Sequence, residues 1–148
     1  MKESSALVTN LLLIAALAQL AVAMLNLCIV RLLKWRDELL RLPLLLQEVF
    51  QVHKWFISVT LAIFGVMTWR FAGEIAHHEE PVFQWLAGCI GVFWAIRTVL
   101  QVAYYSSSHW RGRFGKTVVH VVLLAMYGGM AGLYLWVAAG QAGGGAVP

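Results

Sequence analysis

Charged residues are scarce in this chain. Only 12% of its 148 residues are Asp, Glu, Lys or Arg, whereas 61% are hydrophobic. A soluble domain carries about 25% charged residues, so a water-soluble globule of this size would leave much apolar surface uncovered. The scarcity of charge excludes an ordinary soluble domain and favours a protein whose solvent is the lipid bilayer.

Cysteine is also rare. The two cysteines, Cys28 and Cys89, both stand in apolar runs, and neither belongs to a C-x-x-C pair. Such a pattern does not indicate a disulfide framework. A buried free thiol behaves as a small hydrophobic side chain, so we assign neither cysteine a functional role.

Catalytic motifs are missing as well. The chain has no H-E-x-x-H, no G-x-S-x-G and no G-x-x-x-x-G-K-[ST] pattern. The serines at 106–108 beside His109 are explained by a polar turn. The His-His-Glu-Glu run at 77–80 is interpreted as a solvated acidic loop, because adjacent residues do not share a helix face. We therefore predict no catalytic residues and no metal site, and we expect a non-enzymatic protein.

Four long apolar segments are present instead. They predict helices at about 6–30, 44–73, 82–105 and 116–139. A run of about 20 apolar residues spans the hydrocarbon of a bilayer, and short connections favour antiparallel neighbours. We predict an all-α fold, a four-helix up-down transmembrane bundle in one domain over residues 1–148. The Gly-rich tail at 140–148 is expected to be disordered, and the polar start of the second helix, 44–54, is expected at the membrane interface.

The basic residues predict an orientation. They gather in the first and third connections, whereas the second connection is acidic apart from Arg70. Lys and Arg stay on the cytoplasmic side, so both termini should lie outside, with Lys2 as a weak contrary signal. The basic group of the third connection, at 111–116, fits either this orientation signal or anionic lipid headgroups. Because these charges stand between apolar segments, we predict a bilayer and not nucleic acid as the partner.

Polar side chains gather at the predicted cytoplasmic ends of the helices. An ionisable residue inside a span is a functional candidate, because burying its charge in lipid is costly. Arg97 is the strongest example, and Gln101 follows one helical turn later on the same face. An antiparallel bundle brings further polar groups to this depth, with Glu48 as the natural counter-ion of Arg97. The predicted ligand-binding cluster is Asn26, Glu48, His53, Arg97, Gln101, Tyr104 and His120.

Several functions fit such a cluster. The leading hypothesis is that it binds a lipid-like, quinone-like or anionic ligand with an apolar tail. The alternative is a b-type haem electron-transfer subunit with His53 and His120 as axial ligands. A third hypothesis is an accessory subunit of a membrane complex or a homo-oligomer, in which the cluster only holds helices together. Arg97 snorkelling to the headgroups would also leave the cluster without a ligand.

Four runs carry a resemblance to known proteins. They are 31–36 (RLLKWR), 52–58 (VHKWFIS), 93–105 (FWAIRTVLQVAYY) and 109–112 (HWRG). Together these runs resemble a group of uncharacterised small four-helix bacterial integral membrane proteins. The resemblance implies a multi-pass protein of the bacterial inner membrane and implies nothing about mechanism.

Overall fold

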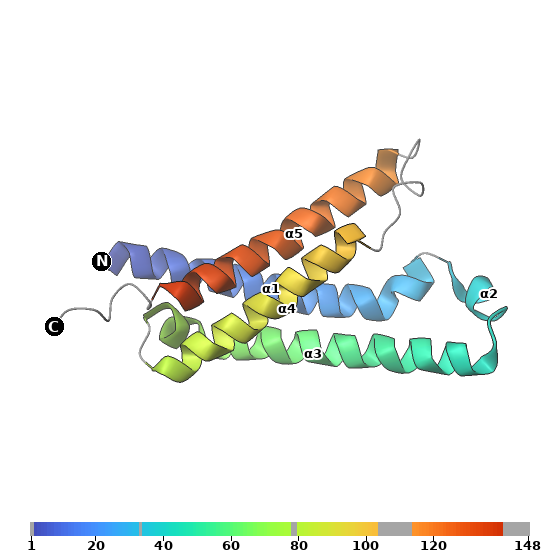
Figure 1. The fold of residues 1–148 in the computed structure, drawn as a ribbon, viewed down its shortest axis with the longest axis horizontal. Helices are drawn as coiled ribbons and strands as arrows, with labels where there is room; N and C mark the ends of the chain where they lie inside the picture. The colour runs from blue at the N-terminus through green and yellow to red at the C-terminus, as the bar shows by residue number, and fades with distance from the viewer. Residues whose placement is uncertain (1, 33, 78–79, 104–113, 141–148) are drawn as a thin grey trace. The chain divides into compact units, whose positions relative to one another are not determined.

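The chain is entirely helical where its structure is described, apart from short connections. The computed structural model describes residues 2–32, 34–77, 80–103 and 114–140 (Figure 1). The helices are α1 (Lys2–Leu32), α2 (Arg36–Leu39), α3 (Leu44–His77), α4 (Pro81–Ala103) and α5 (Phe114–Ala139). Tyr104 of the predicted cluster and the predicted disordered tail beyond Gly140 lie outside the described residues.

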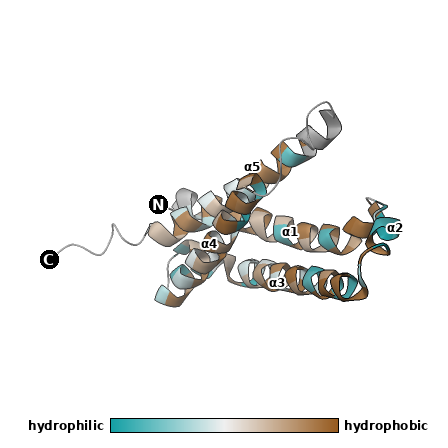
Figure 2. Ribbon diagram, turned by 45° about the vertical axis from the view of Figure 1, so that its right-hand side comes forward, coloured by the Kyte–Doolittle hydropathy of each residue, from teal (hydrophilic) through white to brown (hydrophobic). Residues whose placement is uncertain are grey.

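Four of these helices have the length and composition of membrane spans. The spanning segments are Ser5–Leu32, Leu44–His77, Pro81–Ala103 and His120–Ala139. Figure 2 shows hydrophobic residues, in brown, along all four long helices. The predicted all-α fold with four transmembrane helices is thereby confirmed, and the four helices fit a multi-pass integral membrane protein.

The end of α3 differs from its prediction. The sequence predicts a stop near residue 73, but the helix continues to His77, with one non-helical residue at Phe71 (φ −113°, ψ 20°). Beyond that kink, Ile75 and Ala76 are buried, so this last part of α3, which ends at His77, keeps a buried apolar side. His77 therefore ends a helix rather than standing in a loop, and its ring nitrogens lie 3.0 Å from the Ser5 hydroxyl of α1.

The end of α1 is built by a tight turn at Lys34, whose φ is 55°. The Trp35 N–H donates to the Val30 carbonyl at 3.1 Å, and the Lys34 N–H donates to the Arg31 carbonyl at 3.3 Å. These two bonds make a Schellman motif, in which one left-handed residue satisfies the last carbonyls of a helix. The short helix α2 follows at once. It was not predicted, although Asp37 and Glu38 in its first turn suit a helix start.

Contacts divide the chain into two compact units. Residues Asn10–Ala72 form one, which we call the α1/α3 unit, and Met1–Thr9 with Gly73–Pro148 form the other, the α4/α5 unit. The prediction of one domain over residues 1–148 stays a prediction.

In the α1/α3 unit the two long helices approach closely at Gly65. A Cβ placed on Gly65 would lie 2.9 Å from Leu20 Cγ and 3.1 Å from the Ala16 carbonyl oxygen. Only a glycine permits this distance between the two backbones, as in other membrane helix pairs. Gly65 therefore sets the separation of α1 and α3 in the middle of the unit.

In the α4/α5 unit, an equivalent close approach occurs at Gly91. A Cβ there would lie 2.8 Å from Leu135 Cγ and 3.0 Å from the Leu135 backbone nitrogen. Thr98 of α4 lies opposite Gly128 of α5 at an ordinary contact distance, with its Cγ2 atom 3.9 Å from a Cβ placed on the glycine. As the numbering rises along α4 it falls along α5, so the two helices are antiparallel. This register sets which polar side chains of the unit meet.

Candidate ligand site

Two antiparallel helices bring the polar residues of the α4/α5 unit together. On α4, Trp94, Arg97 and Gln101 recur at intervals of three and four residues and share one side of the helix. On α5, His120 and Tyr127 are seven residues apart, about two turns, and also share a side. The sequence pattern of both helices therefore produces one polar and aromatic strip at their contact.

The part of this strip nearest the middle of the two helices is aromatic. The rings of Trp94 and Tyr127 stack, with centroids 5.2 Å apart and planes 28° apart. Phe93 meets Trp94 edge to face at 5.6 Å. Trp94 is 1% exposed and Tyr127 is 6% exposed. Buried aromatic pairs of this kind add stability beyond their buried area, so the Trp94–Tyr127 pair gives the neighbouring polar groups a stable aromatic surface.

Arg97 lies against the Tyr127 ring of this aromatic pair. Its Cζ atom is 4.9 Å from the centroid of the Tyr127 ring, and the residue is half-buried. Arg97 stands six residues before the last described residue of α4, Ala103, or roughly 9 Å along the axis. Its guanidinium lies over the Tyr127 ring of α5. The alternative that Arg97 snorkels to the headgroups stays a prediction.

No carboxylate of its own helices neutralises Arg97. Neither α4 nor α5 contains an Asp or a Glu, and none occurs anywhere from residue 81 to residue 148. The same part of the chain carries four basic residues, Arg97, Arg111, Arg113 and Lys116. A cation–π contact contributes about 0.5–2 kcal/mol, which offsets only part of the cost of keeping a charge at membrane depth. Arg97 therefore has no carboxylate counter-ion on either of the two helices that form this unit's contact.

Gln101 sits one turn from Arg97 and is 3% exposed. Its amide nitrogen lies 3.1 Å from His120 Nδ1. An amide nitrogen can only donate, so Nδ1 accepts, and a neutral ring then carries its proton on Nε2. The Gln101 Oε1 atom is buried and has no hydrogen-bond partner among the described residues. Turning the amide over would leave its nitrogen without a partner instead.

That lone oxygen is informative because a buried polar atom without a hydrogen bond costs about 1–3 kcal/mol. Native proteins rarely tolerate such an atom without a bound water, ion or ligand. Here it lies one helical turn from a cation that has no carboxylate on its own helices. The arrangement suits a group that carries both a negative charge for Arg97 and a hydrogen-bond donor for Gln101.

The predicted site residues of the α1/α3 unit behave differently. The Asn26 amide nitrogen donates to the Lys54 carbonyl at 3.0 Å and to the Ser58 hydroxyl at 2.9 Å. The Ser58 hydroxyl in turn donates to the Lys54 carbonyl at 2.8 Å. Glu48 and His53, by contrast, are both exposed on α3. Asn26 thus takes part in a contact between helices rather than lining an open site.

The structure therefore gathers only part of the predicted cluster. Arg97, Gln101 and His120 meet in the α4/α5 unit. The prediction that they form one cluster with Asn26, Glu48 and His53, with Glu48 as counter-ion, stays a prediction. Nothing in the described contacts of His53 or His120 supports axial haem ligation. Among the described residues, no group of three or more His, Cys, Asp or Glu side chains could hold a metal ion.

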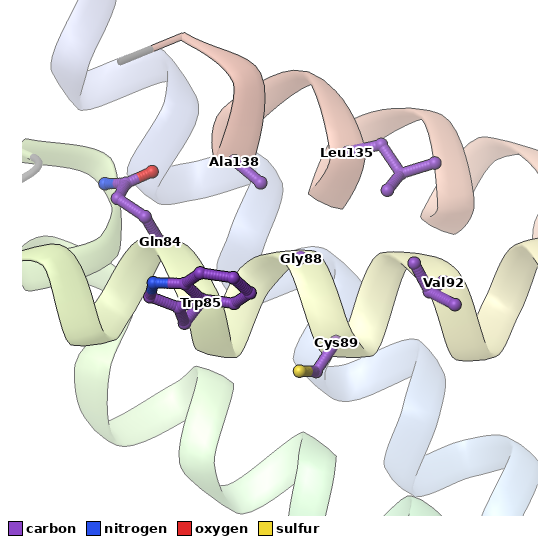
Figure 3. Close-up of a pocket in the computed structure, with 7 residues that line it drawn as sticks. All are labelled: Gln84, Trp85, Gly88, Cys89, Val92, Leu135 and Ala138. Atoms are coloured by element: carbon purple, nitrogen blue, oxygen red, sulfur yellow. The ribbon is translucent and has the colours of Figure 1, made fainter. Parts of the chain in front are cut away.

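One site residue and one groove were not foreseen from the sequence. Tyr127 was missed, although its spacing of seven residues from His120 places both on one side of α5. The groove, with a volume of about 620 Å³, opens between α4 and α5 (Figure 3). Its lining is Gln84, Trp85, Gly88, Cys89, Val92, Leu135 and Ala138.

The groove is separate from the polar strip. Val92, which lines it, is five residues before Arg97, or about 140° around the α4 helix. The groove therefore opens on a different side of α4 from Arg97. Its lining is apolar apart from Gln84 and includes no charged side chain.

Comparison of the chain with protein-family models, with curated proteins and with solved structures gave no match. The assignment of a function thus depends on the residues themselves. The resemblance to small bacterial membrane proteins stays a prediction.

Proposed function

We propose that this integral membrane protein binds an anionic amphiphile, with its headgroup at Arg97, Gln101 and His120. One observation carries the proposal. The buried Gln101 Oε1 atom has no hydrogen-bond partner among the described residues, and it lies one turn from a half-buried arginine whose own helices contain no carboxylate. An anionic headgroup with a hydroxyl group would satisfy both, because its charge would pair with Arg97 and its hydroxyl would donate to Gln101.

The chemistry of the site limits the ligand. A guanidinium binds phosphate or carboxylate oxygens through two parallel hydrogen bonds. With the amide as placed, Gln101 Oε1 can only accept, so the ligand would donate to it; with the amide turned over, the ligand would accept from the nitrogen. An oxidised quinone carries no negative charge for Arg97, so it fits less well than an anionic phospholipid headgroup. The apolar tail would lie along the lipid-facing surface of α4, where Val99 and Leu100 are exposed.

The expected orientation agrees with such a ligand. If the basic connections face the cytoplasm, the Arg97 end of α4 lies in the cytoplasmic leaflet and both termini lie outside. In a bacterial inner membrane, the location that we propose, this leaflet would supply anionic phospholipids. The protein would then act as a lipid-binding or accessory subunit of a membrane complex, without catalysis of its own.

The test compares lipid retention by two charge-removing variants. Wild type, Arg97→Leu and the matched control Arg41→Leu are purified in mild detergent, and bound phospholipids are identified by native mass spectrometry. Arg41 is an exposed arginine outside the α4/α5 unit. We expect wild type and the control to retain anionic over zwitterionic phospholipid. Arg97→Leu should lose about tenfold in affinity, or about 1.4 kcal/mol.

Equal retention of anionic lipid by Arg97→Leu and wild type would contradict the proposal. Circular dichroism of each preparation shows whether helix content is unchanged, so a failure to fold is distinguished from a failure to bind. An absorption spectrum of the same wild-type sample tests the haem alternative, since a b-type haem absorbs strongly in the visible range. A haem spectrum lost in the His120→Ala variant would replace our proposal with that alternative.

A further inference from the structure

A line of large apolar side chains on α3 is exposed along most of the helix. Its members recur at alternating intervals of four and three residues, and each is between 51% and 70% exposed. We call this line the α3 stripe. It consists of Leu45, Val49, Val52, Phe56, Val59, Ile63 and Val66.

The α3 stripe faces away from α1. The contacts of α3 with α1 involve the Lys54 carbonyl, Ser58 and Gly65. Each of these residues stands two positions after a member of the stripe, or about 200° around the helix. The helix therefore has α1 on one side and the stripe on nearly the opposite side.

Lipid accounts for only part of the stripe. Residues 55–69 are apolar almost all round, so exposure there needs no partner beyond acyl chains. In 47–54, by contrast, the other exposed positions are Glu48, Gln51 and His53, whereas Val49 and Val52 continue the stripe. Among the exposed positions of 47–54 the apolar residues thus lie on one side, whereas Phe50 is half-buried on another side of the helix. Exposed apolar residues restricted to one side of a polar helical segment indicate a packing surface.

The polar segment does not bend away to rest flat on the membrane, because α3 continues through it as a regular helix. The non-helical residue of α3 is Phe71, near the other end. The 34 residues of α3 extend about 51 Å, whereas the hydrocarbon layer is about 30 Å thick. The segment 44–54 therefore continues along the axis of a helix that is longer than the hydrocarbon requires, so acyl chains alone do not account for Val49 and Val52 beside Glu48 and His53.

The polar side chains beside the stripe identify what covers it. A four-three repeat is the heptad pattern of a coiled coil, with Val49 and Val52 at its a and d positions. Glu48 directly precedes the a residue Val49 and therefore occupies a g position. His53 directly follows the d residue Val52 and therefore occupies an e position. Between two parallel helices, a g residue faces the e residue five positions later on the other helix. Glu48 of each helix would thus meet His53 of the other.

We propose that the α3 stripe is the interface of a parallel homodimer. Two copies inserted in the same orientation necessarily present parallel α3 helices, and a two-fold axis along the membrane normal pairs each stripe with itself. The pairing of Glu48 with His53 then occurs twice. Within one chain these two side chains are about 140° apart around α3, so they complement each other only between two copies.

Disulfide trapping in native membranes tests the interface. In a background with Cys28→Ala and Cys89→Ala, Val52→Cys is compared with Gln51→Cys, one position away and off the stripe. Two Cα atoms must lie within about 7 Å to be bridged. Mild oxidation should trap at least about tenfold more dimer through residue 52 than through residue 51, since only the former lies on the stripe. Equal trapping at both positions, or none at residue 52, would overturn the proposal.

A charge exchange tests the register. Glu48→Lys should reduce dimer formation about tenfold, measured by energy transfer between labelled copies in lipid vesicles diluted with excess lipid. Adding His53→Glu to Glu48→Lys places opposite charges at the same two positions, so it should recover most of the dimer. A double variant as weak as the single one would contradict the parallel register.

The Val52→Cys variant also tests whether something else covers the stripe. In a homodimer, the introduced thiol should be protected from a maleimide, and dilution with lipid should remove the protection. Protection of that thiol in a strictly monomeric chain would place a different occupant on the stripe and overturn the homodimer.

Discussion

Both units of the molecule hold an amide side chain inside a helix pair, but the two amides differ in how well they are satisfied. In the α1/α3 unit, Asn26 donates to Ser58 and to the Lys54 carbonyl, and Ser58 donates to the same carbonyl. In the α4/α5 unit, Gln101 contacts His120 through its nitrogen, while its buried oxygen has no hydrogen-bond partner among the described residues.

The difference distinguishes a structural contact from the proposed binding site. A set of hydrogen bonds that closes on itself stabilises a helix pair and needs nothing further. A set that leaves a buried acceptor beside an arginine is less stable alone and gains by binding a complementary group. Substitutions in the first unit should therefore change stability alone, whereas those in the second should change stability according to the lipid present.

The largest effect on stability is expected for Gly65→Ala, which disrupts the α1/α3 pair where the two backbones approach closely. In Gly65→Ala the new Cβ would lie 2.9 Å from Leu20 Cγ and 3.1 Å from the Ala16 backbone oxygen, which cannot move without shifting α1. We expect a loss of about 2 kcal/mol in the free energy of unfolding, measured by titration with a denaturing detergent. Gly73→Ala is the matched control, because a Cβ there meets nothing within 4 Å. An unchanged stability for Gly65→Ala would mean that the two helices are farther apart.

A smaller effect is expected for Asn26→Leu, which removes both amide hydrogen bonds between α1 and α3. Ser58 still donates to the Lys54 carbonyl, so that carbonyl keeps a partner. The loss should be about 1 kcal/mol, and it should be the same in anionic and in zwitterionic lipid. A loss that appeared only in anionic lipid would move the binding site into the α1/α3 unit.

The smallest effect on stability is expected for Gln101→Leu, and its sign should differ with and without anionic lipid. Without lipid, the variant removes an unsatisfied buried oxygen along with one contact to His120, so we expect a gain of up to about 1 kcal/mol in the free energy of unfolding. In anionic lipid the wild type should regain the advantage, because its oxygen then has a donor. The check is the same unfolding titration with and without added phosphatidylglycerol. A loss of equal size in both conditions would make Gln101 a structural residue like Asn26.

The fold was accessible from sequence, whereas the site was accessible only in part. Long apolar runs predicted the four spans because a bilayer leaves the backbone few alternatives to a helix. Proximity of Gln101 to His120 was foreseen because antiparallel helices bring residues near the same membrane depth together. The Tyr127 contact and the lone oxygen of Gln101 were not, since each depends on how α4 and α5 rotate about their axes. That rotation is set by small-residue contacts such as Gly91 against Leu135, which hydropathy does not reveal.

The counter-charge of Arg97 would be seen in an experimental structure of the protein in an anionic lipid nanodisc. We expect headgroup density with a phosphate at hydrogen-bond distance from the Arg97 guanidinium and a donor facing Gln101 Oε1. An Arg97 paired instead with a carboxylate of the chain, such as Glu48, with no headgroup density beside it, would rule out the proposed lipid site.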